Sequence, residues 1–416
     1  MNDIYPLDIW HVIFQHSDLL SQLRLISVCS AFNCSFFITD MYNISDIYKD
    51  RLTEQILKQK KFKRIISLDI MCNINNISFL TNLKKLNTYS INQEGINGLD
   101  LIELYAGRNE KIKDVSFMTN LKKLHASGCC GIDQEGIREC NLIELDANCN
   151  EKIKNVSFMT NLKKLHALGC CGIDQEGIKG CNLIELYANY NEKIKTVSFM
   201  TNLKKLYAFG NCGIDQNSIK GLDLITLDVG FNKNIKDVSF MTNLKKLRAS
   251  ENCGIDQEGI RGLDLIELDA NYNKQIKNVS FMTNLKTLIA AHSCGIDQRG
   301  IQRCNLVEFN AGSNEKIKDV SFMTNLKELH IRGDCGIDQN GIKGCNLIEL
   351  DADFNGKIKD VSFMTSLKKL YARGSCGIDQ EGINGLNLIE LYAENNNKIK
   401  DISFMANLKI LNGDIL

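Results

Sequence analysis

Two short stretches, LKKLHASGCCGI at residues 121–132 and LIELDANCNEKI at residues 142–153, decide the fold of this chain of 416 residues. Both have apolar residues at their first, fourth, sixth and last positions, and they begin at Leu121 and Leu142. The next copy begins at Leu162, so the two stretches together form one unit that recurs along the chain. A fixed period of this kind indicates a repeat architecture in which each turn is covered only by its neighbours.

Both stretches fit the pattern L-x-x-L-x-(L/A)-x-x-(N/C)-x-x-I and so resemble leucine-rich repeats. The apolar residues Leu142, Leu145 and Ala147 then point inward, and Asn150 satisfies backbone groups where the chain leaves the strand. The resemblance runs from about Ile65 to the C-terminus, some five-sixths of the chain. It implies an α/β solenoid: a horseshoe of about 17 turns that alternate between about 20 and about 21 residues in length, with one long parallel sheet on its concave side.

The segments that return from one strand to the next carry two further motifs. GIDQEGI, as at residues 131–137, offers an aspartate suited to capping a short helical turn. VSFMTN, as at residues 115–120, recurs once in each two-turn unit, and we expect its phenylalanine to fill the core.

The cysteines follow the repeat rather than a disulfide framework. One column of them recurs once in each unit, at Cys130, Cys171, Cys212, Cys253, Cys294, Cys335 and Cys376. If each unit is two turns, neighbours in this column lie about 9 to 10 Å apart at the usual strand spacing, beyond the roughly 7 Å that a disulfide tolerates. We therefore expect reduced, buried thiols and a reducing compartment.

Charge and hydropathy argue against two classes of partner. Fifty basic and fifty acidic residues give a net charge of zero, without the basic footprint of a nucleic-acid-binding protein. No apolar run of about 18 residues predicts a membrane span, and no secretory leader is evident. The sequence predicts no nucleic-acid and no membrane partner, and a cytoplasmic location, the host cytoplasm if the protein is viral, with the nucleus left open.

Catalytic and metal motifs are weak. The spacing G-x-x-x-x-G at Gly172 to Gly177 is followed by Ile178 and Lys179, so the lysine and hydroxyl of a phosphate-binding loop are missing. Histidine–cysteine pairs such as His125 with Cys129 are lost in later repeats, and no paired-ligand spacing suggests zinc. We expect no enzyme activity, no cofactor and no metal.

The positions expected to face solvent on the concave side vary while the skeleton stays constant. The variable residues include a set of aromatic side chains that should gather on this face: Tyr187, Tyr190, Tyr207, Phe209, Phe231 and Tyr272. Exposed aromatic residues are common anchors of protein interfaces, so this pattern favours a surface that binds a protein target. Neutral drift after duplication is the alternative explanation.

The third strand position alternates in charge, from Glu103 and Lys123 to Glu144 and Lys164, which places opposite charges side by side on adjacent strands. The alternation fails at Thr226 and Thr287. An acidic strip follows, which consists of Glu308, Glu328, Glu349, Asp351 and Asp353. We predict that this acidic strip binds a basic segment of a partner.

The segment at residues 1–40 does not repeat. Pro6 suits the first turn of a helix, Ile9 and Ile13 share a helical face, and Ser17 can cap a second helix that carries Leu20, Leu23 and Ile26. A third short helix is expected after Cys29, and a further helix is expected from Ser45 to Phe62.

This segment resembles an F-box. The residues that carry the resemblance are Tyr5-Pro6, Asp8-Ile9, Ile13-Phe14, Asp18-Leu19-Leu20, Leu23-Arg24, Val28-Cys29 and Phe32. Tyr5 replaces the usual leucine and Phe32 the usual tryptophan, and both keep apolar bulk. Proteins with similar near-identical repeats are also seen in protists' large DNA viruses.

The resemblance implies a substrate-recognition adaptor of a Skp-cullin-F-box ubiquitin ligase. The residues that would bind the Skp-type adaptor, and through it a cullin, are Tyr5, Pro6, Ile9, Ile13, Leu20 and Leu23. The expected organisation is an F-box-like helical domain at 1–40, a linker or capping helix at 41–64 and a leucine-rich-repeat solenoid at 65–416. Two alternatives stay open: an interaction scaffold whose N-terminal helices only cap the solenoid, and, with little room for it, a ligase with its own catalytic cysteine.

Overall fold

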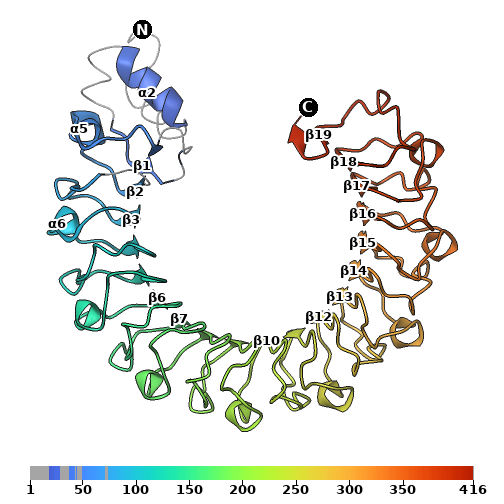
Figure 1. The fold of residues 1–416 in the computed structure, drawn as a ribbon, viewed down its shortest axis with the longest axis horizontal. Helices are drawn as coiled ribbons and strands as arrows, with labels where there is room; N and C mark the ends of the chain where they lie inside the picture. The colour runs from blue at the N-terminus through green and yellow to red at the C-terminus, as the bar shows by residue number, and fades with distance from the viewer. Residues whose placement is uncertain (1–17, 29–36, 43, 45–48, 71–73, 416) are drawn as a thin grey trace. The chain divides into compact units, whose positions relative to one another are not determined.

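The computed structural model describes residues 18–28, 37–42, 44, 49–70 and 74–415. These fall into two compact units, Met1–Ile194 and Lys195–Leu416. In both units short strands lie along one side and the helical turns along the other (Figure 1).

The strands of the first unit are all parallel. They are β1 (Asp40–Met41), β2 (Ser67–Ile70), β3 (Lys85–Thr88), β4 (Glu103–Tyr105), β5 (Lys123–His125), β6 (Glu144–Asp146), β7 (Lys164–His166) and β8 (Glu185–Tyr187). From β1 to β8 each strand pairs with the next in chain order, so β2 to β7 each lie between the strand of the turn before and the strand of the turn after.

The second unit continues the same architecture. Its strands are β9 (Lys205–Tyr207), β10 (Thr226–Asp228), β11 (Lys246–Arg248), β12 (Glu267–Asp269), β13 (Thr287–Ile289), β14 (Glu308–Asn310), β15 (Glu328–His330), β16 (Glu349–Asp351), β17 (Lys369–Tyr371), β18 (Glu390–Tyr392), β19 (Ile410–Leu411) and β20 (Asp414–Ile415). All of its pairings are parallel except β19 with β20. The predicted parallel-sheet solenoid of about 17 turns is confirmed.

The repeat skeleton forms the core as predicted. Leu124, the middle residue of β5, is fully buried and lies in register with Leu104 on one side and Leu145 on the other. Residues on either side of it are half-buried and point away from the core. Apolar stacking between identical positions thus holds each turn to its neighbours.

The asparagine that recurs once in each two-turn unit also behaves as predicted. This asparagine column consists of Asn109, Asn150, Asn191, Asn232, Asn273, Asn314, Asn355 and Asn396, all of them buried. Asn150 is 1% exposed, and its amide group donates to the backbone carbonyls of Ala126 at 2.7 Å and Ile132 at 3.1 Å in the preceding turn. Its side-chain oxygen accepts from the backbone N–H groups of Lys152 and Ile153. One buried side chain therefore satisfies four backbone groups and connects two turns.

In the alternate turns the predicted alignment is off by one residue. The pattern places Cys129 in the asparagine column, but Cys129 is exposed and Cys130 is the buried residue. The chain there passes through Gly128 with φ of 67°, a conformation that glycine adopts without strain. The buried cysteines of this column are free thiols, as expected.

The return segments contain short 3-10 helices at equivalent places. They are η2 (Glu135–Ile137), η3 (Glu176–Ile178), η4 (Asn217–Ile219), η5 (Glu258–Ile260), η6 (Arg299–Ile301), η7 (Asn340–Ile342) and η8 (Glu381–Ile383), and a short α-helix, α6 (Gln93–Ile96), holds the same place in an early turn. The predicted aspartate cap is confirmed, because the Asp133 carboxylate accepts from the backbone N–H of Gly136 at 3.0 Å.

The expectation that the recurring phenylalanine fills the core is wrong. Phe117 is 39% exposed and its equivalents are similarly exposed, whereas Val115 and Met118 are buried. The two buried residues lie three positions apart, so the tight turn directs both inward and leaves the phenylalanine between them on the outer surface.

Near the N-terminus the structure describes α2 (Leu19–Val28), which corresponds to the predicted second helix. The Asp18 carboxylate accepts from the backbone N–H of Ser21 at 2.8 Å and so caps this helix. The predicted cap, Ser17, lies outside the described residues. The single helix expected from Ser45 to Phe62 is wrong in its described part, which has α5 (Glu54–Leu57) and the 3-10 helix η1 (Lys60–Phe62) instead.

The last strand of the sheet is covered by a hairpin. The chain turns at Asn412 and Gly413, both with positive φ, and β20 pairs with β19 in the antiparallel sense. This geometry matches the tight turns that asparagine–glycine pairs favour.

No helix among the described residues has the length and apolar character to cross a membrane.

Candidate interaction surface on the sheet face

The sheet face is the surface formed by the outward-pointing first and third residues of the three-residue strands. These side chains are half-buried on both sides of a buried central residue, as in β6. Because equivalent residues are in register across the strands, each side chain of the sheet face has neighbours from the turn before and the turn after.

In the first unit the predicted alternation of charge is confirmed. The Lys123 ammonium lies 3.5 Å from the Glu103 carboxylate and 4.0 Å from the Glu144 carboxylate, and Lys164 lies 3.2 Å from Glu144. Burial acts to raise the pKa of Glu103, but the ammonium groups of Lys123 and Lys85 outweigh it and hold that pKa below its usual value.

The other column of the sheet face, formed by the third residues of the strands, also contains matched neighbours. His125 stacks on Tyr105 with ring centres 4.3 Å apart, and its Nδ1 lies 3.4 Å from the Asp146 carboxylate. In the second unit the rings of Tyr371 and Tyr392 stack at 4.5 Å. In these places the variable residues differ along the sheet but complement their neighbours, which neutral drift at each position does not require.

A hollow of about 340 Å³ lies in the second unit where the alternation fails. Thr226 and Thr287, which are shorter than the usual lysine or glutamate, line it together with Ile289. Arg248 also lines it, with its guanidinium 3.5 Å from Asp228 and 3.1 Å from Asp269. Sequence reasoning noted the two threonines as gaps in the charge pattern but did not predict the hollow that they leave.

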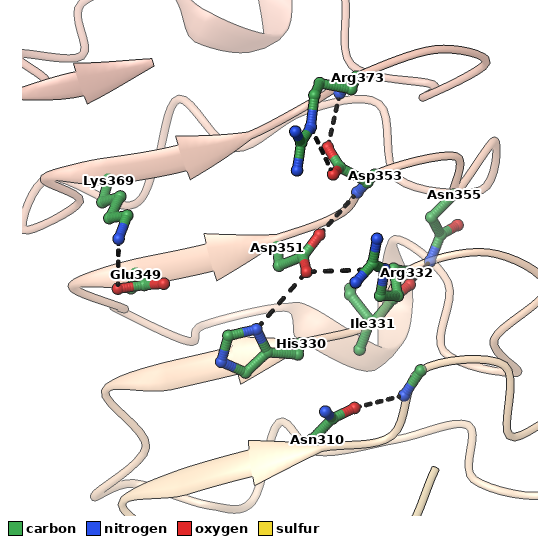
Figure 2. A network of polar contacts seen from close by, with 11 residues as sticks. Asn310, His330, Ile331, Arg332, Glu349, Asp351, Asp353, Asn355, Lys369 and Arg373 are labelled. Atoms are coloured by element: carbon green, nitrogen blue, oxygen red, sulfur yellow. Dashed lines mark hydrogen bonds and ion pairs between the residues drawn. The ribbon is translucent and has the colours of Figure 1, made fainter. Parts of the chain in front are cut away.

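The predicted acidic strip divides into two parts in the structure. Asp351 and Asp353 are buried and compensated, because Asp353 pairs with Arg373 at 2.7 Å and the Asp351 carboxylate faces His330 and Arg332 (Figure 2). These two aspartates are therefore occupied by contacts inside the chain.

The glutamates of the strip lie in register on three adjacent strands, with Glu308 beside Glu328 and Glu328 beside Glu349. Glu349 is compensated by Lys369 at 3.7 Å (Figure 2). Glu328 is exposed, and within the described part of the chain it has only glutamates as its register neighbours.

His330 and Asp351 influence each other's protonation. The contact with the Asp351 carboxylate raises the pKa of His330. Burial acts to raise the pKa of Asp351, but His330 and the backbone N–H of Asp353 outweigh it, so that this pKa is lowered.

The six residues of the predicted aromatic cluster are divided between the two units. In the first unit Tyr187 stacks on His166 with ring centres 4.0 Å apart, and Tyr190 is 56% exposed. In the second unit the rings of Phe209 and Phe231 meet edge to face at 5.3 Å, whereas Tyr272 stacks on His292 at 4.3 Å. Tyr207 lines the hollow described above.

The predicted adaptor-binding residues are largely outside the described part of the chain. Tyr5, Pro6, Ile9 and Ile13 lie outside it, and Leu20 is described only as a backbone position of α2. The remaining residue, Leu23, is half-buried and lines an apolar hollow of about 320 Å³ whose other walls include Met41, Leu52, Ile56 and Phe62.

The buried thiols are poor nucleophiles. Burial raises the pKa of Cys171 to about 11 and does the same for Cys253, so both remain protonated at neutral pH. The histidine of the candidate pair His125 with Cys129 contacts Asp146 instead.

Comparison with known proteins identifies the fold. No protein-family model matches the sequence, and no curated protein is similar enough to be a relative. Among solved structures, the TLR13–ssRNA13 complex matches with a TM-score of 0.54 at 16% identity, covering 85% of this chain and 72% of that one. The fold is therefore that of a leucine-rich-repeat solenoid.

Two further structures match more loosely. The mouse RP105/MD-1 complex has a TM-score of 0.44 at 16% identity, covering 86% of this chain and 72% of that one. The Leptospira interrogans leucine-rich-repeat protein LIC12759 has a TM-score of 0.35 at 16% identity, covering 90% of this chain and 100% of that one.

Proposed function

We propose that this chain is a non-catalytic adaptor that binds a protein target on its sheet face and presents it to a Skp-cullin-F-box type ubiquitin ligase through its N-terminal segment. The two halves of this proposal have different support. The F-box-like residues support the ligase half, and the sheet face supports the target half.

One observation carries the target half: the sheet face combines a constant core with a varied surface on which many neighbouring side chains match. Nearly every strand supplies a buried leucine and every second turn a buried asparagine, while the outward positions supply rings, charges and hollows that change from turn to turn. Pre-organised side chains lose little conformational entropy when a partner binds, so the stacked and ion-paired neighbours favour recognition of a folded protein surface.

Within this proposal the contact residues are the aromatic set Tyr187, Tyr190, Tyr207, Phe209, Phe231 and Tyr272 and the glutamates Glu308, Glu328 and Glu349. Asp351 and Asp353 act indirectly, because their contacts with His330, Arg332 and Arg373 hold neighbouring side chains in place.

The ligase half is tested with purified partners. The full chain should bind a purified Skp-type adaptor, and a chain that lacks residues 1–40 should not. Within the full chain, Pro6→Ala combined with Ile9→Asp should abolish binding, whereas Ile348→Asp, at a residue 45% exposed in the repeats, should leave it unchanged. If the full chain does not bind the adaptor, the N-terminal helices are better explained as a cap, and the chain as an interaction scaffold.

The target half is tested by paired tyrosine substitutions. Replacing Tyr187 and Tyr207 with alanine should abolish target capture without unfolding the chain. Tyr371 and Tyr392, which stack in the same column of the sheet face, provide the matched control. Equal capture by the Tyr187/Tyr207 variant and the unmodified chain would contradict the assignment.

The absence of a nucleic-acid partner remains a prediction. The TLR13 structure is that of a complex with single-stranded RNA, so the point requires a direct measurement. Titration with a labelled single-stranded RNA should give no binding at physiological salt, because the chain has a net charge of zero.

A further inference from the structure

Glu308, Glu328 and His330 bring three potential metal ligands together on the sheet face. One ligand atom from each residue lies within 4.8 Å of the others. Glu308 belongs to β14 and the other two to β15, where Glu328 is in register with Glu308 and His330 is two positions further along the same strand. Alternate residues of a strand point to the same side, so all three side chains project from the sheet face.

The charge around this group is uncompensated in a way that the repeat elsewhere avoids. Lys123, Lys246 and Lys369 occupy the place of Glu328 in other turns, and each forms an ion pair with a glutamate on an adjacent strand. Glu328 instead lies between Glu308 and Glu349. Like charges directly opposite each other on neighbouring strands destabilise a sheet.

The flanking strands offer little to offset this charge. Thr287, which precedes Glu308 in register, contributes a hydroxyl 3.4 Å from its carboxylate. On the other side, Lys369 lies 3.7 Å from both Glu349 and Glu390 and is shared between them. A cation between Glu308 and Glu328 would supply the charge that the repeat provides elsewhere with lysine.

His330 is held in an orientation that suits metal binding. Its Nδ1 faces the Asp351 carboxylate at 3.6 Å, and Asp351 is itself fixed by the backbone N–H of Asp353 at 3.1 Å and by Arg332 (Figure 2). With the Nδ1 proton directed at Asp351, Nε2 keeps its lone pair for a ligand. A carboxylate behind a histidine is the usual outer shell of a metal-bound imidazole.

We propose that Glu308, Glu328 and His330 form a binding site for a divalent transition-metal ion. Two carboxylates and one imidazole suit Zn²⁺ and its neighbours in the first transition row better than Ca²⁺ or Mg²⁺, which prefer oxygen ligands alone. Three protein ligands leave at least one coordination position for water or for a group of another molecule. This inference does not depend on the proposed ligase function.

The proposed site differs from the sequence-based expectation of no metal, because its three ligands are brought together by the fold and not by a short sequence motif. Metal motifs are usually recognised by short spacings within one segment. Here Glu308 and the pair Glu328 and His330 belong to different turns, and they meet because successive turns stack in register.

The same chain contains a matched counterpart without the acidic pair. His125 faces Asp146 at 3.4 Å in the same relation as His330 to Asp351, but Lys123 stands where Glu328 stands in the proposed site. The Lys123 ammonium lies 3.5 Å from Glu103. A cation is therefore already present at that position, and His125 has no acidic ligand set.

The test uses the reduced, chelator-treated full chain and Mn²⁺ as the probe. Mn²⁺ binds carboxylates and imidazole but has low affinity for thiols, so the exposed cysteines Cys129, Cys149 and Cys170 do not obscure the result. Electron paramagnetic resonance should show one bound Mn²⁺ per chain, which Zn²⁺ displaces. Glu328→Lys and His330→Gln should each weaken Mn²⁺ binding at least about tenfold, and His125→Gln should not change it.

Thermal unfolding gives a second readout that separates ligand loss from misfolding. Glu328→Lys restores the usual alternation, so this variant should melt at a higher temperature than the unmodified chain without metal and should not respond to added Mn²⁺. The unmodified chain should be stabilised by Mn²⁺. Absence of Mn²⁺ binding to the unmodified chain, or equal binding to the folded Glu328→Lys variant, would overturn the proposal.

Discussion

Replacing Asn273 with alanine should be among the most destabilising substitutions in the second unit. Asn273 is 1% exposed, and its amide donates to the carbonyls of Ala249 at 2.8 Å and Ile255 at 3.1 Å. Its side-chain oxygen accepts from the backbone N–H groups of Gln275 at 2.8 Å and Ile276 at 3.2 Å. Alanine removes these four bonds to the backbone, together with a weaker one from the amide to the Cys253 sulfur at 3.4 Å, and leaves the backbone partners in a buried site.

The magnitude follows from these bonds. A net contribution of about 1 kcal/mol for each hydrogen bond gives a loss of about 4 kcal/mol in the free energy of unfolding. Asn252 provides the matched control, because it also follows directly after a residue with positive φ, Glu251 at 61°, but is exposed. Its replacement by alanine should cost about 0.5 kcal/mol or less.

The assay is urea unfolding followed by circular dichroism, together with amide hydrogen exchange. In the Asn273→Ala variant the amides of Gln275 and Ile276 should exchange faster, whereas amides several turns away should change little, since each turn contacts only its neighbours. Equal costs for the Asn273→Ala and Asn252→Ala variants would refute the view that this column, rather than local turn propensity, connects the turns.

Three further outcomes are expected. Met282→Ala should lower the free energy of unfolding by about 2 to 5 kcal/mol and Phe281→Ala by clearly less, because Met282 is 1% exposed and Phe281 is 39% exposed. Urea unfolding that ranks the two variants in the opposite order would contradict the observed packing. Gln298→Ala should cost about 1 to 3 kcal/mol by calorimetry, since the Gln298 side chain bonds to two amides and one carbonyl of the next return segment, and an unchanged melting temperature would count against this. Burial raises the pKa of Cys294 to about 11 from an unfolded value near 9, so the folded state holds the thiol proton more tightly. This thiol therefore contributes about 3 kcal/mol to the free energy of unfolding below pH 9, and the contribution is lost as the pH rises from about 9 to 11. The free energy of unfolding of the Cys294→Ala variant should depend less on pH in that range, and the same slope as in the unmodified chain would disprove the effect.

The period of the sequence was sufficient to predict the strands, their parallel order and the inward leucines. These features depend on residues that repeat identically, so any register that buries one copy buries all of them. The roles of Asn150 and Asp133 were also predictable, because both residues recur in the repeat and each has a side chain that accepts from backbone N–H groups close by in the sequence.

Other features depend on geometry that the repeat pattern does not encode. VSFMTN has three apolar residues within four positions, and only the path of the turn decides that Val115 and Met118 are buried and Phe117 is not. The hairpin at Asn412 and Gly413 carried a local signal that was available in the sequence, since an asparagine–glycine pair favours such turns.

The candidate site was predicted in part. The run of glutamates was visible as a break in the alternation of charge. However, the compensation of Asp351 and Asp353 depends on His330, Arg332 and Arg373, whose side chains reach across strands. Contacts between variable residues of different turns have no spacing that a single sequence can show.

The alternation of charge along the sheet also limits how the length of such a chain can change. Loss or gain of a whole two-turn unit brings together strands that already match, with lysine beside glutamate as in Lys123 and Glu144. Loss of a single turn would instead place lysine beside lysine or glutamate beside glutamate. Insertions and deletions that the fold tolerates should therefore come in pairs of turns, and the row of glutamates at β14, β15 and β16 marks the place where the rule is broken by substitution rather than by length.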